Sequence, residues 1–212
     1  MIEIKDMEAG YNTIPKVRIK NLVVEKGTSC LIRGESGSGK TTLLNAISGL
    51  IKPIKGQIQI NQTDLSTIRD EKLDQWRGEK IGFVFQTLHL VKPLTVMENI
   101  LLGAYAAGKP QSKEWAEHLL EETGLKDFGN KRAHGISQGQ AQRVAIARAL
   151  MNKPALILAD EPTSSLDNKS TEQVVTLLTS LSKEYGSTLI VTSHDNRITA
   201  SFDQLLELGV IA

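Results

Sequence analysis

The sequence predicts an α/β protein with a mostly parallel, covered β-sheet and an inserted helical lobe. Two observations support this prediction. In the first and last thirds of the chain, short apolar runs typical of buried strands alternate with helical patterns, as in sheets whose strands are joined by helices. Between them, from Leu94 to about Met151, the pattern is mostly helical, which favours a lobe inserted into the sheet domain.

The first elements form a strand, loop and helix unit. The run TSCLIRG, Thr28–Gly34, is typical of a buried strand. The helix KTTLLNAISGL, residues 40–50, follows it, and one helical face carries Leu43, Leu44, Ile47 and Leu50. Further strands are predicted at residues 57–62 (QIQINQ), which alternate as an exposed strand does, and at residues 80–86 (KIGFVFQ).

The lobe and the last part of the sheet follow. One lobe helix begins at Ser137, because Ser137 and Gln140 have the spacing of a capping box, in which each residue satisfies a free backbone N–H of the other. The remaining elements are helices at residues 95–108 and 113–125, a strand at residues 155–160 (ALILAD), a helix at residues 171–186 and a strand at residues 187–194 (STLIVTSH).

Composition and charge exclude several classes of function. The 25 basic and 24 acidic residues are interspersed and give a net charge of +1, so there is no basic footprint for nucleic acid. The single cysteine, Cys30, cannot form an internal disulfide, which favours a reducing compartment. The N-terminus has no signal core, and no apolar run approaches the roughly 18 residues of a membrane span. We therefore expect a cytoplasmic protein that could dock onto a membrane protein.

The strongest chemical signal is the motif GESGSGKT, Gly34–Thr41, which follows a predicted strand and opens a helix. Its glycines let backbone N–H groups turn toward phosphate oxygens. Lys40 would reach the terminal phosphates, and Thr41 could ligate Mg²⁺. The alternative is a glycine-rich turn with an incidental lysine, which the flanking strand and helix disfavour.

A complementary signal is the acid pair that ends the run ALILADE, residues 155–161. Asp160 and Glu161 would lie at the carboxyl edge of the sheet, where the phosphate loop also lies. Asp160 would hold Mg²⁺ directly or through water, and Glu161 is placed to polarise an attacking water. The alternative is an acidic cap on the following helix.

Three further residues are weaker candidates. Gln86 ends a strand, so its amide could reach the metal or the water, although such a glutamine is more often only solvated. His194 follows a strand and could contact a γ-phosphate, although a lone histidine there is usually unremarkable. Tyr11 could stack on an adenine, although a core tyrosine is the default interpretation.

The phosphate loop, Gln86, the capped ISQGQ helix, the acid pair, the SSLD run and His194 resemble, in this order, the nucleotide-binding domain of ATP-binding cassette (ABC) proteins. The resemblance covers nearly the whole chain and implies a single domain of residues 1–212. It implies a P-loop NTPase core, RecA-like, at about residues 1–90 and 152–212, with an antiparallel N-terminal β part. The helical lobe would span about residues 91–151.

The resemblance also implies the site residues and the ligands ATP and Mg²⁺. The ATP-binding residues would be Tyr11, Gly34, Glu35, Ser36, Gly37, Ser38, Gly39, Lys40, Thr41 and Thr42. The catalytic residues would be Glu161, His194, Lys40 and Gln86, and the metal ligands would be Thr41, Gln86 and Asp160. Gln86 would also sense the membrane partner.

Two motifs would act across a dimer. In this family two domains pack head to tail, and the signature helix of one faces the γ-phosphate held by the loop of the other. The resemblance assigns the signature to Ser137, Gln138, Gly139 and Gln140, and the D-loop to Ser164 and Asp167. The signature departs from the usual LSGGQ at Ile136 and Gln138.

The partners implied are a second copy or a homologous ATP-binding subunit, and an integral membrane permease, with no nucleic acid. Such a permease would place the chain peripherally on the inner face of the cell membrane. Residues 83–103 resemble the lipoprotein-release and macrolide-efflux subgroup, so we expect export or lipid-type extraction. The apolar side chains of Thr87–Val96 are consistent with a permease groove, and equally with lobe packing.

Two alternative functions remain open from the sequence. The chain could be a non-transport ABC ATPase that acts as a regulatory or mechanotransmitting module, and a neighbouring gene for a multi-span membrane protein would argue against that. It could also be a small-molecule kinase that shares the phosphate loop. The helical lobe and the ISQGQ helix between Lys40 and Asp160 argue against a kinase.

Overall fold

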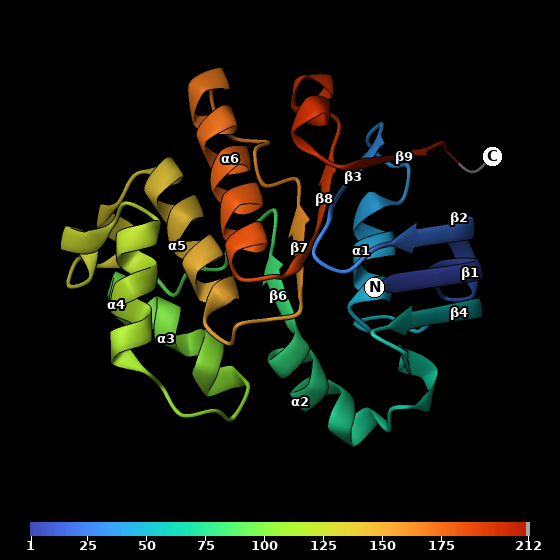
Figure 1. Cartoon of the computed structure of the whole chain (residues 1–212), viewed down its shortest axis with the longest axis horizontal. Coiled ribbons are helices and arrows are strands. Elements are labelled where there is room, and N and C mark those ends of the chain that lie inside the picture. The colour runs from blue at the N-terminus through green and yellow to red at the C-terminus, as the bar shows by residue number, and fades with distance from the viewer. Residues whose placement is uncertain (211–212) are drawn as a thin grey trace.

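The chain folds into two β-sheets with helices between them and beside them (Figure 1). The structure, a computed structural model, describes residues 1–210, so the predicted domain end at residue 212 lies outside the described residues. Within residues 1–210, no helix is both long enough and apolar enough to span a membrane.

The N-terminal sheet is antiparallel, with the strand order β2-β1-β4-β5. Its strands are β1 (Ile2–Tyr11), β2 (Ile14–Val24), β4 (Lys55–Ile60) and β5 (Thr63–Asp64). We predicted an exposed strand at residues 57–62, and this was wrong both about the burial of the strand and about the residue at which it ends. Ile58 and Ile60 face the core at 2% exposure, and β4 ends at Ile60.

The second sheet is parallel throughout, with the strand order β6-β7-β8-β3-β9, which confirms the predicted parallel sheet. Every residue of β7 and β8 is buried, because both faces of this sheet are covered. The strands are β3 (Ser29–Gly34), β6 (Ile81–Val84), β7 (Leu156–Asp160), β8 (Thr188–Ser193) and β9 (Gln204–Leu208).

Helix α1 (Lys40–Ile47) lies between the two sheets. Its leucine and isoleucine side chains are fully buried in an apolar cluster with residues of both sheets. The helix stops before Gly49, whose φ of 70° is a left-handed conformation that terminates helices. Leu50, which we predicted on the apolar face of this helix, therefore lies beyond it and is 46% exposed.

The helical lobe contains α3 (Val96–Ala106), α4 (Lys113–Glu122) and α5 (Gln138–Leu150), and α6 (Asn168–Glu184) covers the parallel sheet beside α5 (Figure 1). The capping box of α5 is confirmed. The Gln140 N–H donates to Ser137 Oγ at 3.3 Å, and the Ser137 N–H donates to Gln140 Oε1 at 2.9 Å. One apolar cluster joins the lobe to the sheet, because it contains Leu119 of α4, Val144 of α5 and Ile157 of β7.

Other elements connect these parts. Helix α2 (Asp70–Lys80) precedes β6, and 3₁₀ turns occupy Leu65–Thr67, Lys126–Phe128, Ala133–Gly135 and Asn196–Ser201. Neither α2 nor β9 was predicted from the sequence pattern.

Candidate functional site

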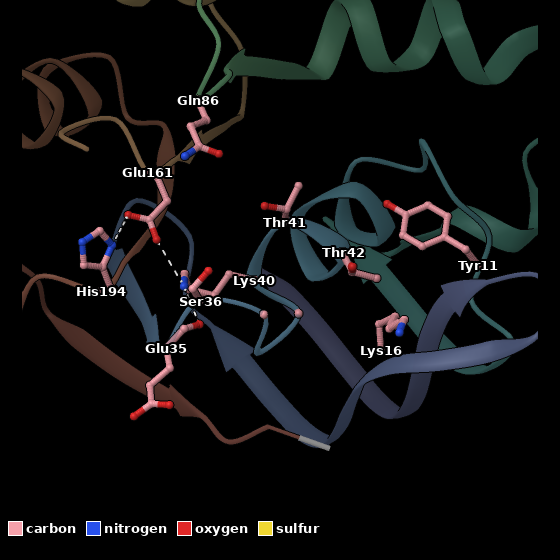
Figure 2. Close-up of a pocket in the computed structure, with 12 residues that line it drawn as sticks. Tyr11, Lys16, Glu35, Ser36, Lys40, Thr41, Thr42, Gln86, Glu161 and His194 are labelled. Carbon is pink, nitrogen blue, oxygen red and sulfur yellow. Dashed lines mark hydrogen bonds and ion pairs between the residues drawn. The ribbon is translucent and has the colours of Figure 1, made fainter. Parts of the chain in front are cut away.

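The site lies where four neighbouring parallel strands end. Strands β6, β7, β8 and β3 are adjacent in that order, so their carboxyl ends meet at one edge of the sheet. Gln86 follows β6, Glu161 follows β7, His194 follows β8 and the glycine-rich loop follows β3. A pocket of about 730 Å³ opens at this edge (Figure 2), lined by Tyr11, Lys16, Glu35, Ser36, Gly37, Gly39, Lys40, Thr41, Thr42, Gln86, Glu161 and His194.

The glycine-rich loop leads into α1 through a left-handed turn. Gly39 precedes the helix with a φ of 92°, and a Cβ at this position would lie 2.5 Å from the main-chain oxygen of Lys16. Only glycine fits this conformation and this close approach. The turn directs the free N–H groups at the start of α1 toward the pocket, which makes an anion-binding helix terminus. Ser38 and Gly34 do not line the pocket, and Ser38 is buried.

Lys40 places a buried positive charge in this loop. Its ammonium group donates to the main-chain oxygens of Gly34 at 2.7 Å and Glu35 at 2.9 Å, and it lies 3.2 Å from Glu161 Oε1. The Lys40 side chain is only 7% exposed. Since an ammonium group can be held by several oxygens at once, the same position suits the oxygens of a bound phosphate.

Thr41 and Asp160 place two possible metal-ligating oxygen groups side by side, next to the loop. The Thr41 hydroxyl donates to Asp160 Oδ2 at 2.8 Å, and the Thr192 hydroxyl donates to Asp160 Oδ1 at 2.7 Å. Within residues 1–210, no group of three or more His, Cys, Asp or Glu side chains could hold a metal ion. A hydroxyl and one carboxylate suit Mg²⁺, which usually completes its coordination with phosphate oxygens and water.

Glu161 is held in an unusual backbone conformation. Its φ is 45°, a left-handed value that costs a residue other than glycine roughly 1–2 kcal/mol. The Glu161 N–H donates to the main-chain oxygen of Thr192 at 3.1 Å and to its hydroxyl at 3.0 Å, which stabilises this conformation. The carboxylate lies between Lys40 and His194, whose Nδ1 is 2.9 Å from Glu161 Oε2 (Figure 2). Two oppositely placed partners thus fix the carboxylate at the pocket wall.

The alternative that the acid pair only caps the following helix was wrong. Helix α6 is capped by Asp167, whose Oδ1 accepts a hydrogen bond from the Ser170 N–H at 3.0 Å. That bond is the main reason why the pKa of Asp167 lies below its ordinary value. Asp160 and Glu161 precede this cap by several residues and are buried. Glu161 lines the pocket, and Asp160 lies behind it, bonded to the pocket residue Thr41.

Tyr11 and Lys16 line the other end of the pocket. Tyr11 is 47% exposed, so the default interpretation as a core tyrosine was wrong. Its hydroxyl accepts a hydrogen bond from Asn45 Nδ2 at 3.2 Å, which leaves the ring at the pocket wall (Figure 2). Lys16 was missed by the sequence interpretation. An isolated lysine in an alternating strand carries no signal, and only the packing of β2 on the loop brings it here.

The predicted signature and D-loop residues lie outside this pocket. Ser137 to Gln140 form the start of α5, and Ser164 and Asp167 are exposed in the segment before α6. None of them lines the pocket. A Cβ at Gly139 would meet no atom within 4 Å, so the start of α5 is open to an approaching group.

A second cavity of about 350 Å³ lies between β6, α3 and the end of α5. It is lined by Gly78, Ile81, Gly82, Phe83, Phe85, His89, Leu102, Gly103, Ala106, Arg148, Ala149 and Asn152. We call this surface the aromatic groove, because Phe83 and Phe85 stack in it with ring centroids 4.1 Å apart. Of the segment Thr87–Val96, which we expected either to form a permease groove or to pack in the lobe, only His89 lines the aromatic groove, and Leu88 is buried in the core cluster.

Known proteins resemble this chain over most of its length. Residues 17–164, more than half of the chain, match the ABC transporter family. The chain is 39% identical, over 98% of its length and 93% of the relative, to the lipoprotein-releasing system ATP-binding protein LolD of Saccharophagus degradans. It is 42% identical to the macrolide export ATP-binding/permease protein MacB of Shewanella sp. strain W3-18-1, over 98% of this chain but only 32% of that protein.

Solved structures give the same result. The ATP-binding cassette MJ0796, whose structure is described as dimeric and as a bacterial ABC transporter cassette, superposes with a TM-score of 0.88 at 36% identity. The match covers 98% of this chain and 94% of that one. A second structure of that cassette is described as a post-hydrolysis dimer bound to ADP and Pi, with the same TM-score of 0.88.

Proposed function

The chain belongs to the ABC transporter family and is an ATP-binding ATPase, and from this premise we propose which residues perform the reaction and what it drives. The pocket between the glycine-rich loop and Tyr11 holds ATP, with the phosphates at the start of α1 and the base against the Tyr11 ring. One observation carries the proposal. The ends of the adjacent strands β7, β8 and β3 bring Lys40 and His194 into direct contact with Glu161 beside the phosphate-binding loop.

Each polar group in the pocket has a definite task. Lys40 neutralises charge on the terminal phosphates, where the buried setting strengthens the interaction. Glu161 accepts a proton from the attacking water as the bond between the β–γ bridging oxygen and the γ-phosphorus breaks to give ADP and phosphate. His194, which contacts Glu161 at 2.9 Å, orients that carboxylate and contacts the γ-phosphate. Gln86 lines the same wall and reaches the water or the metal.

A Mg²⁺ ion fits the oxygen donors of this site. Thr41 and Asp160 would hold it, with Gln86 nearby, and the ion would supply charge neutralisation to the phosphate oxygens. Lys40, Glu161 and His194 perform their own steps as described above.

The site is completed across a dimer. The open start of α5 at Ser137 to Gln140 presents free N–H groups and a positive dipole end, which suits the γ-phosphate held by a second chain. Phosphate charge is then shared between one chain's loop and the other chain's helix, and hydrolysis removes that bridge. Ser164 and Asp167 lie in the exposed segment that faces the partner in such a pair.

Closure of this dimer on ATP, and its opening after hydrolysis, drive an integral membrane permease in export or extraction. Two kinds of relative support this direction, since one is named for lipoprotein release and the other for macrolide export. The chain spans about a third of the macrolide export relative, whose name includes a permease, so the permease partner would be a separate region or a separate protein. Docking at the aromatic groove would place the chain peripherally at the membrane.

The test of this proposal is the oligomeric state of two variants. Glu161→Gln keeps the size and hydrogen bonding of the side chain but removes the charge that activates water, so hydrolysis should fall by about 100-fold or more while ATP still binds. In size-exclusion chromatography this variant should be a dimer with ATP and Mg²⁺ and a monomer without them. Adding Gly139→Asp places a like charge where the partner's γ-phosphate must lie, so the double variant should bind ATP yet remain monomeric.

Gly209→Asp provides the matched control in the Glu161→Gln background. A Cβ at Gly209 also meets no atom within 4 Å, but the residue lies far from α5 in the sequence and outside the signature. This control should dimerise with ATP. Dimerisation of the Gly139→Asp double variant would show that Ser137 to Gln140 form only a capped helix start.

A further inference from the structure

Arg148, near the C-terminal end of α5, binds the chain segment that follows Gln86. Its Nη2 donates to the main-chain oxygen of Leu88 at 2.6 Å, and its Nη1 donates to the main-chain oxygen of His89 at 3.0 Å. The fork of the guanidinium group thus holds two successive carbonyl groups across a sequence separation of 59 and 60 residues. The sequence motifs gave no reason to select this arginine.

The charge of Arg148 is not used in an ion pair. The side chain is half-buried, and burial lowers the pKa of the Arg148 guanidinium from its ordinary value. Among residues 1–210, its hydrogen-bond partners are these two carbonyl groups, and no carboxylate forms an ion pair with it. Because burying a charge without a counterion is costly, the geometry of the two bonds is what this residue provides.

The bound segment is strained at the same place. His89 has a φ of 48°, a left-handed conformation that is unfavourable for a residue with a side chain. Such a conformation persists only where surrounding contacts hold it. Arg148 supplies one contact at His89 itself, and burial of the Leu88 side chain supplies another.

Helix α5 therefore connects three regions. Its first residues are Ser137 to Gln140, its last turn holds the segment after Gln86 through Arg148, and Arg148 also lines the aromatic groove with Phe85 and His89. A helix of this length moves as a rigid body, so a displacement of its start is transmitted to its end.

We propose that Arg148 is a positioning residue that fixes the segment from Gln86 to His89 to α5, so that Gln86 takes its place in the pocket when the start of α5 is engaged. This inference rests on the proposed roles of Gln86 and of the signature. Loss of the two bonds frees Gln86 from α5 without changing the glycine-rich loop or Tyr11.

The experiment measures steady-state ATP hydrolysis by the purified chain. Arg148→Met keeps the length of the stem and removes both donors, so kcat should fall by about tenfold while KM for ATP changes by less than about twofold. The Mg²⁺ concentration for half-maximal activity should rise, because Gln86 is less well held. Arg148→Lys keeps a hydrogen-bond donor for these carbonyl groups but lacks the planar fork, so it should recover part of kcat.

Arg143→Met is the matched control. Arg143 lies on the same helix and also bonds a main-chain oxygen, that of Thr123 at 3.0 Å, together with Gln173 Oε1 at 3.1 Å. Neither of these hydrogen bonds involves the segment after Gln86. This variant should lose stability to a similar degree while its kcat and Mg²⁺ dependence stay unchanged.

A double-mutant cycle with Gln86→Ala separates the role of Arg148 from the proposed role of Gln86, on which it rests. If Arg148 acts through Gln86, adding Arg148→Lys or Arg148→Met to Gln86→Ala should cause little further loss of kcat. Full additivity, or an unchanged kcat in both Arg148 variants, would overturn the role of Arg148 alone. A fully active Gln86→Ala variant would overturn the role of Gln86, and this inference with it. The lysine variant keeps the test decisive if the methionine variant does not fold.

Discussion

At the scale of single residues, the site depends on how one ammonium group is shared. Lys40 already bonds two loop carbonyls and lies 3.2 Å from Glu161. In the proposed reaction, a phosphate oxygen that enters the loop would compete with these acceptors, and a phosphate that pairs with Lys40 would also free Glu161 to accept a proton from the attacking water. The two residues are therefore coupled, and each sets the electrostatic environment of the other.

Replacing Lys40 by alanine tests this coupling. Lys40→Ala removes the charge on the terminal phosphates, so ATP affinity or turnover should be lost, with kcat/KM reduced by about 100-fold or more. Phosphate release from ATP by the purified variant is the measurement. Lys16→Ala, which removes a lysine at the other end of the same pocket, should retain most of the turnover. Normal hydrolysis by Lys40→Ala would contradict the assignment of the phosphate loop.

The ring of Tyr11 should contribute to nucleotide affinity. An aromatic stacking contact is worth about 1 kcal/mol, so Tyr11→Ala should raise the Kd for ATP by about fivefold. Tyr11→Phe removes only the hydrogen bond with Asn45 and should bind as before. Isothermal titration calorimetry of the folded variants distinguishes the two. Equal affinities for all three proteins would mean that the ring does not contact the base.

The site residues that could be predicted are those with a local signal. The spacing of the glycine-rich motif predicts Lys40 and Thr41, and the end of an apolar strand predicts Asp160 and Glu161. Thr192, Lys16 and Arg148 could not be found in this way, because their roles depend on which strand or loop packs beside them. Thr192, for example, reaches Asp160 only because β7 and β8 are neighbours in register.

At the scale of elements, the predictions succeeded where a strand or helix has its own pattern and failed where tertiary packing decides. The buried strands β3, β7 and β8 and the capped helix α5 follow from local apolar runs and caps. The hairpin of β1 and β2 turns at Asn12 and Thr13, which have φ values of 50° and 63°. Such turns usually show an Asn-Gly pair, so threonine conceals the signal.

Charged sequences conceal other elements. Helix α2 (DEKLDQWRGEK) lacks an apolar stripe, and Leu73 is its one residue in the described apolar core. Strand β9 lies at the edge of the sheet, where Leu205 is 39% exposed. Neither segment has the periodicity from which we predicted the others.

Strand β9 is attached to β3 by a carboxylate. Asp203 Oδ2 accepts hydrogen bonds from the Ser29 N–H at 2.8 Å and from the Ser29 hydroxyl at 2.7 Å. The backbone bond first, and then the side-chain bond, hold the pKa of Asp203 below its ordinary value. A carboxyl group whose pKa is depressed in the folded state contributes stability above its unfolded pKa of about 3.9 and loses it as the pH falls through the folded pKa.

Asp203→Asn should therefore lower the urea midpoint of unfolding at neutral pH, and this difference should narrow once the pH falls below about 4. Urea titrations across this pH range are the measurement. Asp127→Asn, which replaces an exposed aspartate of the lobe, should leave the midpoint nearly unchanged. A difference for Asp203→Asn that persists unaltered at low pH would exclude the charged hydrogen bonds as its cause.

At the scale of the whole molecule, two apolar clusters divide the fold. One contains α1, the antiparallel sheet and one side of the parallel sheet, and the other joins the opposite side to the lobe. The parallel sheet is thus shared by both clusters, and the pocket proposed to bind ATP lies at its edge. The aromatic groove lies between β6 of this sheet and α3 of the lobe, so its shape depends on the relative position of sheet and lobe.

A charge in the aromatic groove should separate transport from hydrolysis. Phe83→Glu places a carboxylate beside Phe85, so the permease should no longer dock, while ATP hydrolysis by the isolated chain should be nearly unchanged. Two quantities are measured for each variant. One is the amount of the chain that co-purifies with the membranes after detergent extraction, and the other is the ATPase activity of the purified chain in solution. Leu205→Glu, at an exposed position on β9, is the control and should remain with the membranes. Unaltered recovery of Phe83→Glu would place the permease contact elsewhere.

The position of the signature outside the chain's own pocket has a consequence for mixtures of defective chains. In the proposed dimer there are two reaction centres, and each one would combine the phosphate loop of one chain with the α5 start of the other. A chain damaged only in the loop and a chain damaged only at Gly139 are each inactive when paired with themselves. When the two kinds pair with each other, both lesions fall in the same centre and the second centre is intact. Two alleles that are each inactive alone could therefore complement each other in one cell, although both lie in the same gene.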